Sequence, residues 1–236
     1  MRDGMSCEAL VRRRLDLLYR RDGDGRMVAT NETFGAGEEA PVAHVCMSRE
    51  VVVFAVRYGL PAAVEAQLVG ILGALEPLPE AEYRSVGDRI WGLVRRVPGV
   101  RTIEFGPVYR LPGRLAVSPE VVLIDQNNSG VLPSEFAAMA EGLPLVQPCF
   151  GRLVRGRAVS TCQTVRSNLM DREAGVETLL SHRRFGYGSE VVAAWGQEVQ
   201  HRGLTPTYST DWNNHGSVGI ARRLGLIQFA VEINIE

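Results

Sequence analysis

The stretch Glu173–Ser189 reads E-A-G-V-E-T-L-L-S-H-R-R-F-G-Y-G-S and decides the fold. Its first part, residues 174–179, alternates apolar or β-branched residues with glycine or glutamate, which predicts a short strand. A loop with two arginines and two glycines follows, and apolar residues at helical spacing after Ser189 predict a helix that ends at Gly203. A strand, a glycine loop and a helix N-terminus together favour phosphate binding, because backbone N–H groups converge and the helix start carries partial positive charge.

This loop differs from two common phosphate-binding motifs. The dinucleotide motif G-x-G-x-x-G needs a third glycine, and this chain has Val191 at that place. The P-loop motif needs a lysine, and all 26 basic residues of the chain are arginines. What remains is R-x-x-G-x-G, from Arg183 to Gly188, between a predicted strand and a predicted amphipathic helix. Taken alone, this six-residue pattern also fits an ordinary tight turn.

The composition is that of an ordinary globular protein. Of the 236 residues, 45% are hydrophobic and 22% are charged, and the net charge is −1. This length suffices for one large domain or two small ones. No apolar run reaches the roughly 18 residues of a membrane span, and the charged start does not resemble a secretory signal. We therefore expect a cytoplasmic protein with no membrane partner.

Cysteine and arginine usage narrows the chemistry. The four cysteines form no C-x-x-C pair, so the sequence predicts neither a zinc site nor a disulfide framework. The absence of lysine excludes a Schiff-base lysine. Arginines 12–14, 20 and 21 cluster on a predicted helix of residues 7–20 whose leucines face inward, which favours a solvated helix face over a nucleic-acid site. We expect no metal and no nucleic-acid partner, and we expect His44 to be an ordinary strand histidine.

The first part of the chain, residues 1–112, is predicted to form an N-terminal α/β subdomain without a catalytic motif. After the first helix and a glycine-rich loop, the pattern predicts strands at 42–47 and 51–56, helices at 60–75 and 80–96, and strands at 100–105 and 108–110. The prolines and glycine at 107, 112 and 113 predict a boundary.

The second part, residues 113–236, alternates strands and helices. Strands are predicted at 121–124, 148–154, 157–165, 174–179, 205–210 and 227–235, with helices from about 133, from 189 to 203 and from 214 to 224. This order indicates the α/β class, with a mixed sheet into which helices are inserted.

Three motifs of the second part resemble the GNAT superfamily of acetyl-CoA-dependent N-acetyltransferases. The R-x-x-G-x-G loop resembles its pyrophosphate loop, and N-N-H-G-S at 213–217 with L-G-L at 224–226 resembles its N-x-x-S/A…L-G-F segment. The run from Tyr208 to Leu226 resembles a subgroup in which this region also follows E-A-G-V-x-T. The resemblance is strong over residues 148–236 and implies a GNAT-like acyltransferase core, preceded by an N-terminal extension.

The resemblance implies that acetyl-CoA binds as a co-substrate. Backbone groups of Val176, Glu177 and Thr178 would pair with the pantetheine amides as though the cofactor were an extra strand, and the Val176 amide would stabilise the oxyanion. The pyrophosphate would lie on the loop formed by Arg183, Arg184, Phe185, Gly186, Tyr187, Gly188 and Ser189. Asn214 and Ser217 would border the pantetheine arm, although helix capping also accounts for both.

The resemblance also raises the question of which groups move protons. Glu173 and Glu177 are the nearest carboxylates on the cofactor strand, and either could take the proton of the acceptor ammonium directly or through a water. The alternative is that both are surface residues of an exposed strand face. On the neighbouring strand, Ser209 stands where some relatives keep a carboxylate.

For the acid, many relatives carry a tyrosine seven residues after the asparagine, and this chain has Ala221 there. Tyr208 and His215 are the local substitutes. The sequence therefore leaves two hypotheses: an enzyme that moves an acetyl group to an amine by direct attack, or a non-catalytic acyl-CoA-binding module. We favour the enzyme because glutamates remain on the cofactor strand. We expect an unidentified amine acceptor whose cleft the N-terminal part walls, and a monomer or a homodimer.

Overall fold

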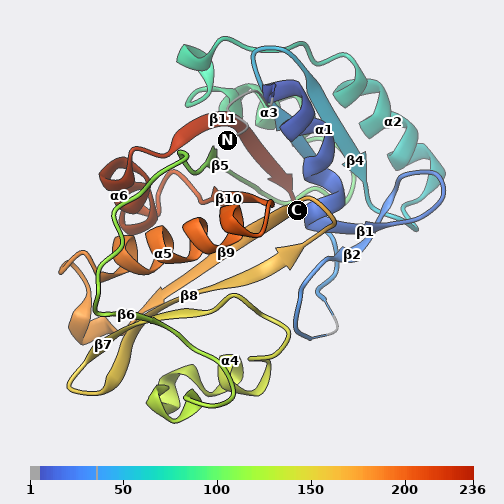
Figure 1. The fold of residues 1–236 in the computed structure, drawn as a ribbon. Helices are drawn as coiled ribbons and strands as arrows, with labels where there is room; N and C mark the ends of the chain where they lie inside the picture. The colour runs from blue at the N-terminus through green and yellow to red at the C-terminus, as the bar shows by residue number, and fades with distance from the viewer. Residues whose placement is uncertain (1–5, 36) are drawn as a thin grey trace.

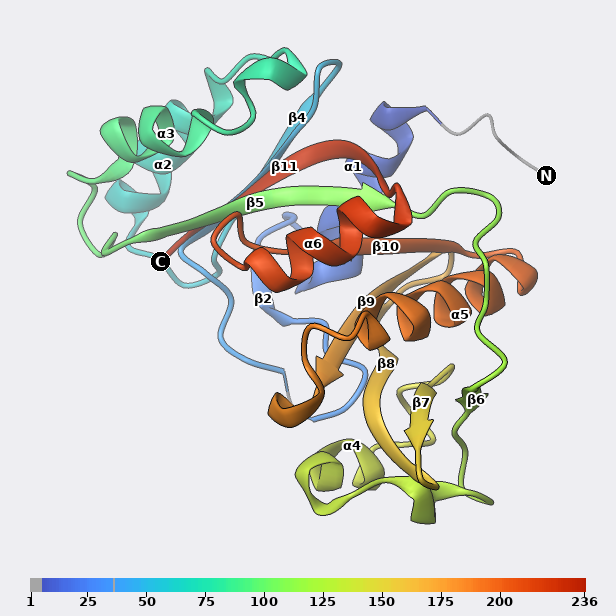
Figure 2. The same cartoon turned by 90° about the vertical axis from the view of Figure 1, so that its left-hand side faces the viewer.

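A mixed sheet runs through the protein and takes in strands from both parts of the chain (Figures 1 and 2). The computed structural model describes residues 6–35 and 37–236. Within these residues the strand order of the large sheet is β4-β3-β11-β5-β10-β9-β8-β7-β6, and β1 pairs with β2 in a small separate sheet. Neighbours in the large sheet are antiparallel except β10 and β9. The predicted α/β class with a mixed sheet is confirmed.

The elements have the following bounds. The strands are β1 (Tyr19–Arg21), β2 (Met27–Thr30), β3 (Ala43–Met47), β4 (Val52–Val56), β5 (Ile103–Arg110), β6 (Val121–Leu123), β7 (Phe150–Val154), β8 (Arg157–Ser167), β9 (Asp171–Thr178), β10 (Thr205–Ser209) and β11 (Ile227–Ile235). The helices are α1 (Cys7–Leu18), α2 (Ala62–Gly73), α3 (Val86–Val94), α4 (Ala137–Glu141), α5 (Tyr187–His201) and α6 (His215–Leu224). Short 3₁₀ turns lie at η1 (Glu80–Glu82), η2 (Ser129–Val131), η3 (Ser134–Phe136) and η4 (Leu180–His182).

The predicted element boundaries agree best with the structure where the apolar periodicity is strong. They differ where the backbone conformation changes within the predicted element. The first helix ends at Leu18 because Tyr19 is already extended and pairs with β2. The helix predicted over 80–96 is a 3₁₀ turn followed by the shorter α3. The two strands predicted around Pro107 are one strand, β5, because the Pro107 carbonyl still accepts a hydrogen bond from the Thr210 N–H at 3.3 Å.

Strand β5 comes from the first part of the chain but lies between two strands of the second part. It pairs along its length with β11 and over residues 108–110 with β10, antiparallel to both. Strand β3 adds to the far side of β11. Residues on both sides of the expected boundary at 112 therefore belong to one sheet.

The two faces of the sheet are covered differently (Figure 2). On β5, Ile103 and Phe105 pack in the core of α2 and α3, and Tyr109 packs in the core of α5 and α6. These positions differ by even steps, so the four helices cover the same face. Val108 points the other way and packs against α1. Helix α1 therefore lies on the opposite face.

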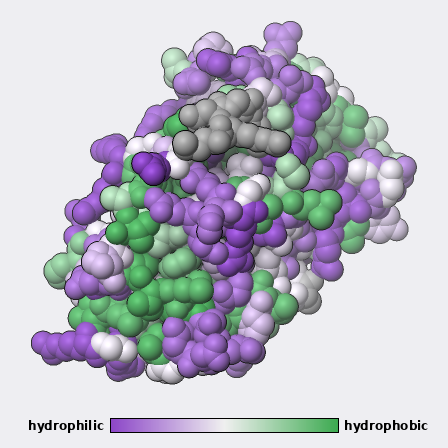
Figure 3. All heavy atoms as spheres, in the orientation of Figure 1, coloured by the Kyte–Doolittle hydropathy of each residue, from purple (hydrophilic) through white to green (hydrophobic). Residues whose placement is uncertain are grey.

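The segment 111–120 crosses the outer side of α5 on its way from β5 to β6 (Figure 1). The Gln200 amide donates to the Pro112 carbonyl at 2.9 Å, and the absence of a side chain at Gly196 makes room for Leu111. Figure 3 shows hydrophobic residues gathered on this side of the molecule, over the region of α5 and β6. In the part of the chain that the structure describes, no helix is both long enough and apolar enough to cross a membrane.

Candidate active site

The parallel strands β9 and β10 separate partway along their length. They pair from Asp171 to Glu173 on β9 and from Thr205 to Thr207 on β10. Beyond this point β9 runs on to Thr178 paired with β8, while β10 stays with β5. Among the described residues, no strand pairs with the β10-facing edge of residues 174–178. Backbone groups on this edge are free to pair with an extended ligand.

A cavity of about 800 Å³ opens at this separation. Its walls are the end of β9, the loop after it and the first turns of α5 and α6. The predicted residues that line it are Val176, Glu177, Thr178, Arg183, Arg184, Gly186, Tyr187, Gly188, Ser189, Asn214 and Ser217. Glu173, Phe185 and Tyr208 were also predicted as site residues but do not line it. The fold thus brings together residues from two motifs that are separated in the sequence by helix α5 and strand β10.

The loop before α5 presents a helix N-terminus to this cavity. Gly186 is the N-cap and has a φ of 87°, in the left-handed region that glycine tolerates. Arg184 also has a positive φ, 71°. No side chain caps α5, so its first N–H groups point into the space before the helix. Such an end binds anions through N–H groups and the helix dipole.

Cationic side chains surround the loop. Arg183, Arg184 and Arg223 all line the cavity, and the Arg183 Nε donates to the Thr178 carbonyl at 3.2 Å. The Arg223 guanidinium lies so close to Gly186 that a Cβ there would be 2.4 Å from one of its nitrogens. Arginine hydrogen-bonds phosphate oxygens in a bidentate manner. The arrangement therefore suits a pyrophosphate at this end of the cavity.

The start of α6 forms the opposite wall. The Asn214 side chain is the N-cap of α6 and accepts a hydrogen bond from the Ser217 N–H at 3.1 Å. Both residues also line the cavity, so the same two residues cap the helix and border the cavity. Ile220, one turn further on, also lines the cavity, and a Cβ at Gly188 would lie 2.8 Å from its Cδ1 atom. Helices α5 and α6 are therefore in close contact beside the loop.

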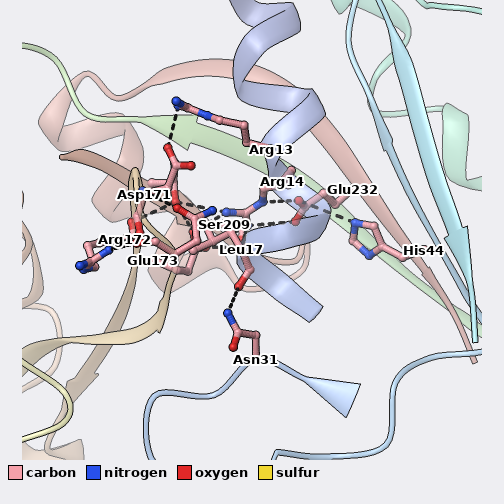
Figure 4. A network of polar contacts seen from close by, with 12 residues as sticks. Arg13, Arg14, Leu17, Asn31, His44, Asp171, Arg172, Glu173, Ser209 and Glu232 are labelled. Atoms are coloured by element: carbon pink, nitrogen blue, oxygen red, sulfur yellow. Dashed lines mark hydrogen bonds and ion pairs between the residues drawn. The ribbon is translucent and has the colours of Figure 1, made fainter. Parts of the chain in front are cut away.

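Glu173 is neither at the cavity nor on an exposed strand face, the two environments expected from the sequence. It is 2% exposed, and both of its oxygens bond to the Arg14 guanidinium, at 2.5 and 3.1 Å (Figure 4). Thr207 and Ser209 donate their hydroxyls to the same carboxylate. Burial alone would raise the pKa of Glu173, but the Arg14 charge and these hydrogen bonds outweigh it and leave the pKa below its ordinary value. Glu173 is thus a buried, ionised residue of β9 that is paired with Arg14 and does not line the cavity, which weighs against its role as the base.

Arg14 corrects a second expectation, that the arginines of the first helix form a solvated face. It is 2% exposed and reaches from α1 to Glu173 on β9 and to Glu232 on β11 (Figure 4). The same attraction lowers the pKa of Glu232 to about 2, against the effect of burial. On the other side of Glu232, His44 hydrogen-bonds Tyr19 and Asn234, as suits an ordinary strand histidine. The N-terminal helix is thus held to the point where β9 and β10 separate.

The remaining candidates lie as follows. Tyr208 is 1% exposed, its hydroxyl donates to the Ser217 carbonyl at 3.4 Å, and burial raises its pKa. Ala221 is buried in the core beside α5. Phe185 is exposed and stacks on Tyr187, with 5.7 Å between ring centroids. Glu177 is exposed and lines the cavity, so of the two glutamates it alone faces the space where a cofactor would lie.

Sequence reasoning missed several lining residues. Ile220 and Arg223 follow Ser217 at intervals of three, so the helical period of α6 could have found them. Glu135 and Phe136 come from a 3₁₀ turn distant in sequence, and no local signal marks them.

A second cavity of about 240 Å³ adjoins the first and shares Glu135, Phe136 and Glu177 with it. Its other walls are residues 32–34 of the N-terminal part, residues of α4 and β8, and Val146. Within the described residues, no group of three or more His, Cys, Asp or Glu side chains is arranged to hold a metal ion.

Comparison with known proteins finds remote structural likeness. No family model matches the chain, and no curated protein matches its sequence. A GNAT-family protein from Novosphingobium aromaticivorans matches at 16% identity and a TM-score of 0.46, over 58% of this chain and 66% of that one, just under two thirds.

Two further structures match over more of the chain. A GNAT-family acetyltransferase from Colwellia psychrerythraea has 13% identity and a TM-score of 0.47, over 83% of this chain and 81% of that one. A GCN5-related N-acetyltransferase from Sphaerobacter thermophilus has 14% identity and a TM-score of 0.48, over 84% of this chain and 76% of that one. At such identities the case for function rests on the geometry of the site.

Proposed function

We propose that this chain is a GNAT-type N-acetyltransferase that moves the acetyl group of acetyl-CoA to an amine. The observation that carries the proposal is the separation of β9 from β10 directly before a glycine loop and an uncapped helix N-terminus. A cofactor with an amide-containing arm and a pyrophosphate needs both features at once. One offers strand-like backbone pairing, and the other offers an anion site with arginines around it.

In this proposal acetyl-CoA lies along the free edge of β9. The pantetheine amides pair with backbone groups of residues 176–178, and the pyrophosphate lies on the loop at Arg184–Ser189. Asn214 and Ser217 border the arm from α6. The Val176 N–H then faces the thioester oxygen, where it stabilises the negative charge that develops during attack.

The chemical step needs little more from the protein. The ammonium first loses a proton to Glu177 or through water to solvent, and the amine nitrogen then attacks the thioester carbon. The C–N bond forms, the C–S bond breaks, and the nitrogen gives up a second proton to water as the amide forms. The sulfur leaves as a thiolate and takes a proton from water. A thiol with a pKa of about 8.5 is a tolerable leaving group, so Ala221 in place of a tyrosine does not prevent turnover.

One set of observations favours a non-catalytic acyl-CoA-binding module as the second candidate. Glu173 is held in an ion pair and Tyr208 is bonded to a carbonyl, so two of the three suggested catalytic groups are engaged elsewhere. Glu177 remains, and it is the reason to prefer the enzyme.

The test separates binding from turnover. Acetyl-CoA at a hundred times its Kd should stabilise the folded chain by about 2.7 kcal/mol, which is measured as a rise in Tm. The release of free CoA thiol is then measured in the presence of a mixed amine library. A rise in Tm with amine-dependent release supports the enzyme, and a rise without release supports the binding module. No rise at millimolar acetyl-CoA would overturn both.

A further inference from the structure

We infer that the second cavity holds the acceptor and selects a compact primary amine with an apolar body. This rests on the proposed function of the first cavity. The two cavities meet at Glu135, Phe136 and Glu177, and Glu177 is the neighbour of Val176, whose N–H faces the thioester in the proposed complex. An amine bound in the second cavity therefore has its nitrogen directed towards the reacting carbon.

The size and lining of the cavity set the body of the acceptor. Its volume is about 240 Å³, below the roughly 300–1,000 Å³ typical of sites for drug-sized ligands. Apolar side chains form much of its wall: Phe34, Phe136, Met139, Val146 and Val165. A short chain carrying an aromatic or branched alkyl group fits this space. A several-ring aminoglycoside is too large, and a long polyamine would place charge against apolar walls.

The polar groups of the cavity set the charge of the acceptor. Gln163 lines the cavity, and its Oε1 atom is buried with no hydrogen-bond partner among the described residues. Leaving a buried acceptor unpaired is costly, and a turn of this side chain into the cavity would let an ammonium or amine N–H satisfy it. Glu135 and Glu177 also line the cavity, and within the described chain neither forms an ion pair, whereas Glu32 is paired with Arg166 at 2.5 Å. The unpaired carboxylates favour a cation.

The reaction of such an acceptor balances without any further reactant. The primary ammonium and acetyl-CoA give the N-substituted acetamide, CoA thiol and one proton. The proton leaves through Glu177 or water, and the apolar body stays in the second cavity throughout.

The experiment measures binding and turnover of 2-phenylethylamine on the full chain loaded with CoA or acetyl-CoA. We expect saturable binding by calorimetry, and CoA release with a higher kcat/KM than for spermidine, kanamycin or a peptide with a free N-terminus. Gln163→Leu should raise the Kd of 2-phenylethylamine on the order of tenfold, because one hydrogen bond to a charged group is lost. Gln67→Leu, on the exposed face of α2, is the matched control and should not change the Kd.

A second variant pair tests the space itself. Ala138→Phe should block 2-phenylethylamine while leaving the acetyl-CoA rise in Tm intact, because Ala138 lines only the second cavity of the two. Ala137→Phe, its exposed neighbour outside both cavities, should bind like the wild type. Equal binding in these two variants would overturn the inference.

The outcomes also separate this inference from the proposed function. Preferred turnover of the polyamine, the aminoglycoside or the peptide, with no binding of 2-phenylethylamine, overturns the acceptor class and leaves the acetyltransferase standing. Binding of 2-phenylethylamine without CoA release supports the second cavity as a site for compact apolar amines and overturns the transfer reaction.

Discussion

Arg14 joins helix α1 to two strands through buried charges. Arg14→Met should lower the free energy of unfolding by about 3–5 kcal/mol, because Glu173 and Glu232 would remain buried without a counter-charge. Urea unfolding followed by circular dichroism measures the change. Arg12→Met is the control: Arg12 is exposed on the same helix and pairs with Glu8, so its loss should cost about 0–1 kcal/mol. Equal losses in the two variants would contradict the buried network.

Tyr208 should prove dispensable for the chemistry. Its hydroxyl is bonded to the Ser217 carbonyl and does not reach the cavity wall, so Tyr208→Phe should keep kcat within tenfold of the wild type. Acetyl-CoA affinity should also stay nearly unchanged. Steady-state CoA release measures kcat, and a melting curve confirms the fold. A hundredfold loss in a well-folded variant would identify Tyr208 as the proton donor.

At the scale of single residues, the sequence predicted which residues lie at the candidate site better than it predicted their burial and their partners. The loop that we propose as the cofactor site could be predicted because its residues are contiguous, so one turn carries most of them to the cavity wall. Glu173 and Arg14 could not be paired, because they are 159 positions apart and an arginine on an amphipathic helix normally faces water. Glu173 and Glu177 lie on the same strand, but Glu173 is buried against Arg14 of α1, whereas Glu177 is exposed and lines the cavity.

At the scale of elements, the contact between the starts of α5 and α6 governs the cofactor loop. Gly188→Val should abolish the rise in Tm with acetyl-CoA, because the new side chain would push against Ile220 and disturb the first turn of α5. Gly70→Val is the matched control: Gly70 lies in α2, away from the site, and a Cβ there meets nothing within 4 Å. An undiminished rise in the Gly188→Val variant would mean that the loop does not hold the cofactor.

Periodicity explains which elements could be predicted. The hairpin β3–β4 and helices α2, α5 and α6 carry apolar residues at regular spacing, and their boundaries lie within a few residues of the predicted ones. The helix expected from about residue 133 is a 3₁₀ turn and the short α4. This region packs through Leu132 and Met139 on a core that includes Cys149 and Ala158, and such contacts leave no local pattern in the sequence. In this segment, Glu135 and Phe136 line both cavities, so the second cavity was the part of the candidate site least accessible to sequence reasoning.

At the scale of the whole molecule, residues 113–236 should not fold alone. Without β5 the facing edges of β10 and β11 have no partner, and without Arg14 two carboxylates stay buried unpaired. The fragment should lack a cooperative melt and should not bind acetyl-CoA, as circular dichroism and calorimetry would measure. A four-residue insertion after Gly113, in an exposed connection of the intact chain, is the control and should be tolerated. A cooperative melt of the fragment would contradict this expectation.

The position of β5 could not be predicted from the sequence, because strand pairing across the chain leaves no local pattern. Prolines and a glycine near residue 112 mark a real connection, but the chain on either side returns to a common sheet. A boundary in the sequence need not be a boundary in the fold.

The placement of β5 also bears on how the chain emerges during synthesis. Its last residue, Arg110, leaves the ribosome before its partner strands, which begin at Thr205 and Ile227. At about 5–20 residues per second, roughly 100 residues of waiting correspond to on the order of 5–20 s. During that interval β5 has neither of its neighbouring strands, so the backbone groups on both of its edges lack their final partners. Both partners are present only when the chain is complete.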